Sequence, residues 1–177
     1  RARHRRCRGL PVRTNYHWDT AMEPADLLRR LRALFPGEDN TGFHALDLIH
    51  KFGSPLTPLL YAELFWPELV EIQGMVFLAT VVEDEDDHAR VMNALSHHGG
   101  DRNRVEQAFN CIEVPSLFGG RAEESNHEED LLLARKLAAM WRARLADCYP
   151  DRVFEVSVDV PADELDEVAV RFYQVGS

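Results

Sequence analysis

The sequence predicts an α+β domain, in which helices cover one face of a largely antiparallel sheet built from two hairpins. Helix-like segments dominate the chain, two pairs of β-branched and aromatic runs interrupt them, and each pair follows a helix that ends near a proline. The chain has 177 residues, a size typical of one domain with a full hydrophobic core. We therefore expect residues 22–177 to form a single α+β domain.

Three helix-like segments precede the first pair of strands. Residues 24–35 and 43–52 repeat apolar side chains at helical spacing, and each segment is followed by a glycine-containing turn. Residues 57–65 begin with a Thr-Pro pair, which is typical of a helix start, and end just before Pro67. These patterns predict three helices.

The middle of the chain predicts a hairpin followed by two more helices. Residues 69–72 and 75–82 are β-branched or aromatic runs that flank Gln73-Gly74, a two-residue hairpin signal. The acidic residues 83–87 suit the positive end of a helix dipole, so a fourth helix is expected to start there. A fifth, short helix is expected over 101–109.

The last third of the chain predicts a loop over 119–124, a long helix and a second hairpin. Ser125 and Glu128 form the pattern of a capping box ahead of the helix, whose body covers 129–148. Apolar side chains recur along one face of this helix, and we expect Trp141 to anchor it in the core. The alternating runs 153–160 and 168–175, joined by the turn at 161–166, predict the hairpin.

Charge is distributed unevenly. The whole chain has a net charge of −10, but residues 1–21 contain six arginines and one aspartate and carry +5, so the rest carries −15. The acidic body disfavours nucleic acid as a partner, because phosphate contacts require clustered lysine and arginine. Residues 1–21 lack apolar periodicity, and we expect a basic extension, disordered or artefactual, outside the domain. A basic arm with a function of its own is the alternative.

Composition also bears on the cellular setting. Charged residues interrupt the apolar runs before they reach the roughly 20 residues of a bilayer span, so no membrane segment is expected. Cys7, Cys111 and Cys148 are far apart, which predicts neither a disulfide framework nor a zinc knuckle and favours a cytoplasmic location. Cys111 lies in an apolar stretch and is expected to be a buried, unreactive core residue. The excess of arginine over lysine indicates a bacterial source.

No local pattern assembles a catalytic, metal or cofactor site. His44 and His50 would lie about 120° apart around a helix, so one helix cannot bring both to one ion. His88 and His97 would lie about 13 Å apart along the expected fourth helix, too far apart to bind one ion. The chain lacks phosphate-binding loops and the G-x-S-x-G elbow, so we expect no cofactor and no metal.

Two classes of function remain. The first is a small acidic binding protein for a basic protein, for example an immunity-type inhibitor of a basic toxin or an adaptor. The second is a hydrolase-type enzyme whose site combines carboxylates with histidines from distant segments, the candidates being His44, His88, His97 and His98. The lack of a local catalytic motif favours the binding protein over the enzyme.

Four residues are candidates for contact with a partner. Asp84, Asp86 and Asp87 belong to the densest acidic run, and clustered carboxylates attract a basic protein over long range. Trp66 follows a helix beside Pro67, and tryptophan is enriched in protein interfaces. The alternatives are a solvated helix start for the run and core packing for Trp66.

Overall fold

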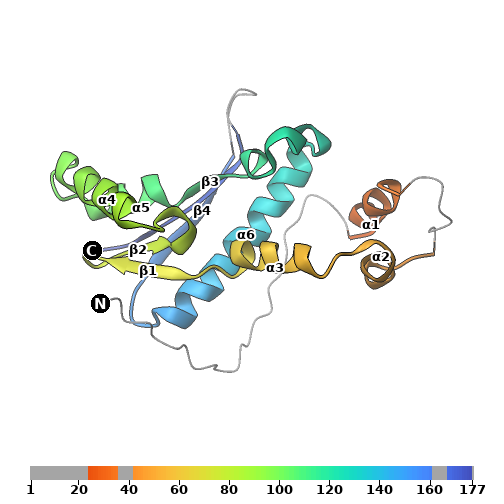
Figure 1. Ribbon diagram of the computed structural model, residues 1–177, viewed down its shortest axis with the longest axis horizontal. Helices are drawn as coiled ribbons and strands as arrows, with labels where there is room; N and C mark the ends of the chain where they lie inside the picture. Colours follow the sequence, from red (N-terminus) through yellow and green to blue (C-terminus); the bar gives the residue numbers. More distant parts are fainter. Residues whose placement is uncertain (1–23, 36–41, 161–166, 177) are drawn as a thin grey trace.

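The computed structural model describes residues 24–35, 42–160 and 167–176 (Figure 1). The expected extension over 1–21 and the turn at 161–166 lie outside these residues. The described elements follow in chain order: α1 (Pro24–Ala33), α2 (Ala45–Phe52), α3 (Leu56–Phe65), β1 (Leu69–Ile72), β2 (Met75–Leu78), η1 (Ala79–Val81), α4 (Glu85–His97), α5 (Arg102–Phe109), β3 (Cys111–Glu113), η2 (Pro115–Glu124), α6 (His127–Cys148), β4 (Phe154–Asp159) and β5 (Ala169–Gln174).

The predicted α+β class is confirmed. Both predicted hairpins form and both are antiparallel, since β1 pairs with β2 and β4 pairs with β5. The two hairpins do not share one ladder, however. β1 and β2 form a two-stranded sheet, while β5 lies between β3 and β4 in a three-stranded sheet. The sequence did not predict β3, because three residues are too few to show a strand pattern.

Helices cover β2 on both faces, whereas the sequence predicted cover on one face. Val76 and Leu78 belong to a core that includes the inner side chains of α6. Met75 and Phe77 point the other way, into a second core with side chains of α4 and α5. All four residues of β2 are buried, and a short run of continuous apolar residues is typical of a strand covered on both sides.

Trp141 anchors α6 in the core, as predicted. Its side chain is 1% exposed and meets the ring of Phe172 edge-on, with the centroids 5.9 Å apart. Its indole Nε1 donates a hydrogen bond of 2.9 Å to the carbonyl oxygen of Leu64 in α3. The same residue therefore fastens α3 to α6 and fills the space above the sheet.

The residue that caps the start of α6 differs from the predicted one. The N-cap of α6 is Asn126, which forms a capping box with Glu129, so the predicted pairing of Ser125 with Glu128 is wrong. The hydroxyl of Ser125 lies 2.7 Å from a carboxylate oxygen of Asp130, to which it donates a hydrogen bond instead.

Two 3-10 helices also replace predicted elements. η1 follows β2 where the strand was expected to continue to residue 82, and η2 occupies the predicted loop at 119–124. Gly119 interrupts η2 with a positive φ of 52°, a conformation that favours glycine.

A junction between the two sheets depends on the carboxylate of Glu106, which lies in α5 and is fully buried. One of its oxygens accepts a hydrogen bond of 2.7 Å from the backbone N–H of Val76 in β2. The other accepts one of 2.7 Å from the backbone N–H of Gln174 in β5. One side chain thus accepts hydrogen bonds from backbone N–H groups of two strands that do not pair with each other.

Asn110 completes this junction from the residue just before β3. Its side-chain oxygen accepts from the N–H of Leu78, and its amide nitrogen donates to the carbonyl oxygens of Val76 and Phe172, at 3.1, 2.9 and 3.4 Å respectively. Buried backbone groups without partners would each cost about 1–3 kcal/mol. Glu106 and Asn110 together therefore replace the missing ladder between β2 and β5.

Burial raises the pKa of the Glu106 carboxyl above its ordinary value of 4.5, against the lowering effect of the two backbone hydrogen bonds and of nearby arginines. The folded state then binds more protons than the unfolded chain between the ordinary and the raised pKa. In that window this group makes the free energy of unfolding fall as pH rises.

We expect Glu106→Gln to lower the free energy of unfolding by about 1–3 kcal/mol at neutral pH, since an amide NH2 would face one of two backbone N–H groups. The substitution should also remove the contribution of this group to the pH dependence above pH 4.5. Urea denaturation at several pH values measures both effects. The exposed Glu155→Gln is the matched control, with an expected change within about 0.5 kcal/mol. Equal stability of Glu106→Gln and wild type would contradict the proposed junction.

Candidate functional site

Two of the three predicted partner-binding aspartates have structural roles at the start of α4. Asp84 is the N-cap, and its carboxylate accepts a hydrogen bond of 2.9 Å from the N–H of Asp87. The carboxylate of Asp87 accepts one of 3.0 Å from the N–H of Glu83 and forms an ion pair with Arg90 at 2.5 Å. Part of the charge of the acidic run is therefore engaged within the helix itself.

The hydrogen bond from Glu83, followed by the charge of Arg90, holds the pKa of the Asp87 carboxyl below its ordinary value despite some desolvation. Asp86 is different, because its side chain is exposed and lies away from the capping position. Among the three aspartates, Asp86 is thus the one whose substitution removes no capping hydrogen bond, and only its interaction with the helix dipole would change.

Trp66, the fourth predicted contact residue, ends α3. Its side chain is 44% exposed, so it is not a core residue, the alternative that the sequence left open. The guanidinium of Arg144 lies 5.5 Å from its ring centroid and also donates to the carbonyl oxygen of Pro67 at 3.0 Å. Within the described residues, no hydrogen bond, ion pair or ring contact joins Trp66 to the acidic run.

The histidines proposed for the enzyme alternative lie on two separate helices. His44 is the N-cap of α2, whereas His88, His97 and His98 belong to α4 or its C-cap. Figure 1 places α2 and α4 at opposite ends of the molecule. In the described part of the chain, no group of three or more histidine, cysteine, aspartate or glutamate side chains is arranged to hold a metal ion.

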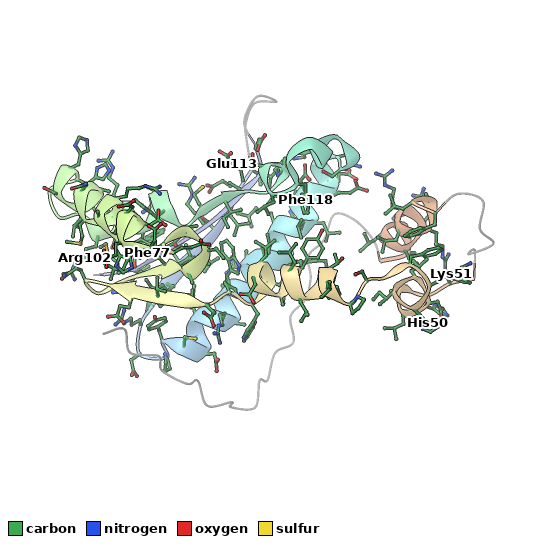
Figure 2. All side chains as sticks on the ribbon, in the orientation of Figure 1. His50, Lys51, Phe77, Arg102, Glu113 and Phe118 are labelled. Atoms are coloured by element: carbon green, nitrogen blue, oxygen red, sulfur yellow. The ribbon has the colours of Figure 1, made fainter. Side chains whose placement is uncertain are left out.

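One face of α3 packs against the rest of the protein, mainly through aromatic side chains. Leu64 and Phe65 pack against the core, and the Tyr61 ring contacts both Phe65 and Phe118 of η2, with centroids 6.4 and 6.5 Å apart. Figure 2 labels Phe118 on the side of η2 that faces α3. Together with the Trp141 hydrogen bond, these contacts fix the helix on α6.

The opposite face of α3 is apolar and exposed. Leu56, Leu59, Leu60 and Glu63 share this face because they follow the i, i+3, i+4, i+7 spacing. The three leucines are 74%, 65% and 71% exposed. A helix that is apolar on all sides is normally buried in a protein interior. The helical pattern of residues 57–65 predicted α3 but not this second apolar face, although the leucines that form it are visible in the sequence.

A groove of about 740 Å³ lies beside β3. Apolar and polar side chains both line it, from η1, α5, β3 and η2, with Arg171 contributed by β5. The guanidinium of Arg171 forms an ion pair with Asp159 of β4. This groove was not predicted from the sequence, because it depends on β3, which was not predicted either.

Cys111 lines the groove and is partly buried, so its predicted place in the core is wrong. Cys111 and Ile112 alternate across β3, and only Ile112 packs against the main core. Burial, opposed by Arg171, raises the pKa of the Cys111 thiol above its ordinary value. The raised pKa agrees with the predicted low reactivity of this residue.

Comparison with protein-family models, with curated proteins and with solved structures finds no match for this chain. None of the helices that the structure describes combines the length and the apolar composition needed to cross a membrane.

The structural roles of the aspartates can be separated by stability measurements. We expect Asp84→Ala to lower the free energy of unfolding by about 1 kcal/mol, because it removes the N-cap acceptor of α4. Asp86→Ala is the matched control and should change it by less than about 0.5 kcal/mol. Urea denaturation of both variants tests this, and equal effects would show that the cap of α4 is not specific to Asp84.

Proposed function

We propose that this protein is a small acidic binding protein that recognises a basic protein, with the exposed face of α3 as its principal contact surface. The observation that carries this proposal is the exposure of α3. Its sequence is largely apolar, as in a buried helix, yet none of its residues is buried and the three leucines of one face are open. Exposed apolar surfaces of this kind mark protein interaction sites.

The nature of the surface explains how a partner would gain affinity. Complete burial of a leucine is worth about 1.5–3 kcal/mol, so covering Leu56, Leu59 and Leu60 offers a substantial favourable term. The exposed ring of Trp66 follows the same helix and could extend this contact with an aromatic anchor, which interfaces favour. On this proposal, Arg144 holds one side of that ring in place.

Charge argues for a basic partner. The chain has a net charge of −10, and Glu63 places a carboxylate on the same face of α3 as the leucines. The exposed Asp86, with Asp84 and Asp87 beside it, adds attraction over a longer range. Complementary charge acts mainly by raising the association rate and by suppressing wrong partners.

An immunity-type inhibitor of a basic toxin and an adaptor both fit this proposal, since neither requires a catalytic group. A cytoplasmic location is part of it, and Cys111 is a free thiol. The enzyme alternative gains no support from the histidines, because α2 and α4 hold them apart.

We expect Leu59→Ser and Leu60→Ser, alone and together, to weaken binding of the partner, by at least tenfold in the double variant. The partner would be obtained by affinity capture from native cells and titrated as a purified protein by calorimetry. Val153→Ser is the matched control, because Val153 is an equally exposed apolar residue outside α3. Unchanged affinity of the double variant would contradict the assignment of the contact to α3.

Asp86→Lys should slow association with the same partner several-fold at low salt and flatten the dependence of the rate on ionic strength, because exposed charges are screened beyond a Debye length of about 8 Å at physiological salt. Asp86→Asn should have a smaller effect in the same direction. Stopped-flow measurements at two salt concentrations test this. An association rate that does not depend on salt or on residue 86 would reject the acidic contribution.

A further inference from the structure

The free edge of β3 and the groove beside it form a second surface, separate from α3. The antiparallel register pairs Cys111 with Arg171, Ile112 with Val170 and Glu113 with Ala169. The N–H of Val114 donates to the carbonyl oxygen of Val168, which continues this register by one residue. In such a ladder alternate residues turn their backbone groups toward the neighbouring strand. Residues 112 and 114 therefore face β5.

It follows that the backbone N–H and C=O groups of Cys111 and Glu113, two residues that line the groove, point away from β5. β3 is an edge strand, since the described part of the chain pairs it with β5 alone. An unpaired strand edge is a template for an extended peptide, which adds main-chain hydrogen bonds and places alternate side chains in pockets.

The side chains around this edge indicate what such a peptide carries. Glu113 and Arg171 are the charged residues among those that line the groove, and Arg171 is already paired with Asp159. The hydroxyl of Ser116, also in the lining, lies 3.4 Å from a carboxylate oxygen of Glu113 and 2.9 Å from one of Glu167. Two carboxylates thus meet beside the groove, and among the described residues neither forms an ion pair with a lysine or arginine.

The groove also has apolar walls. Val81 of η1 and Leu117 of η2 line it, and Leu117 is partly exposed. A bound strand presents its side chains alternately to its two faces. We propose that the groove binds an extended segment of the basic partner, in which basic residues that meet Glu113 and Glu167 alternate with apolar ones, and which pairs with β3. This inference rests on the proposed function and assigns a second contact to the same partner class.

A synthetic eight-residue peptide that alternates lysine with valine is the probe for this groove, and fluorescence anisotropy measures its affinity. We expect the full-length chain to bind it at least tenfold more tightly than the same peptide with N-methylated backbone amides, and more tightly than a version with glutamate for lysine. Binding should also protect the amide of Glu113 from hydrogen exchange, because that N–H points away from β5 and would pair with the peptide. No binding at millimolar peptide, or equal binding of the N-methylated peptide, would overturn the inference.

Two variants of Glu113 separate the effect of backbone pairing between the peptide and β3 from the effect of the Glu113 charge. Glu113→Pro removes the outward N–H but no hydrogen bond to β5, and proline is tolerated on the open side of an edge strand. It should weaken the peptide at least tenfold. Glu113→Gln should weaken it less and reduce its salt dependence. If Glu113→Pro does not fold, the N-methylated peptide still decides the question with the wild-type protein.

Leu59→Ser distinguishes this inference from the proposed function. The variant should bind the peptide like wild type, since α3 lies outside the groove. Peptide binding without any role for α3 in partner affinity would overturn the α3 contact alone. A role for α3 without peptide binding would overturn the groove alone.

Discussion

The fold depends on the hydrogen bonds by which Glu106 and Asn110 connect two sheets that share no ladder. β2 is buried on both faces, so its outward-facing backbone groups have no access to water and need partners within the protein. The two side chains supply them and reach β5 at the same time. Without the junction, β2 would lose its own hydrogen bonds to the second sheet. The first hairpin would keep its apolar contacts and the hydrogen bonds of Arg152 to Gly74 and Glu71.

The same junction sets the position of the surfaces that we assign to binding. Asn110 lies between the end of α5 and the first residue of β3, so its contacts with β2 and β5 also place the free edge of β3. On the other side of the sheet, Trp141 packs against Phe172 and fastens α3 through Leu64. The core therefore presents the groove and the exposed helix as rigid features, which lowers the entropic cost of binding.

Local patterns were enough to predict the class, the helices and both hairpins, because periodicity and turn residues act over short stretches of chain. They could not predict the junction, whose hydrogen bonds join residues 30, 32 and 68 positions apart. A glutamate such as Glu106 in a short polar helix has the pattern of a surface residue. The roles of Asp84 and Asp87 as capping groups are local, but only their charge toward a basic partner was predicted. The exposure of α3 depends on which neighbours fold against it.

Native-state hydrogen exchange tests the central claim most directly, because it reports the opening free energy of each backbone amide. We expect the amides of Val76 and Leu78 in β2 and of Gln174 in β5 to exchange with the same high opening free energy and to lose it together in Glu106→Gln. A first hairpin that opens at a much lower free energy than β5 in the wild-type protein would show that the two sheets are independent and would contradict the account.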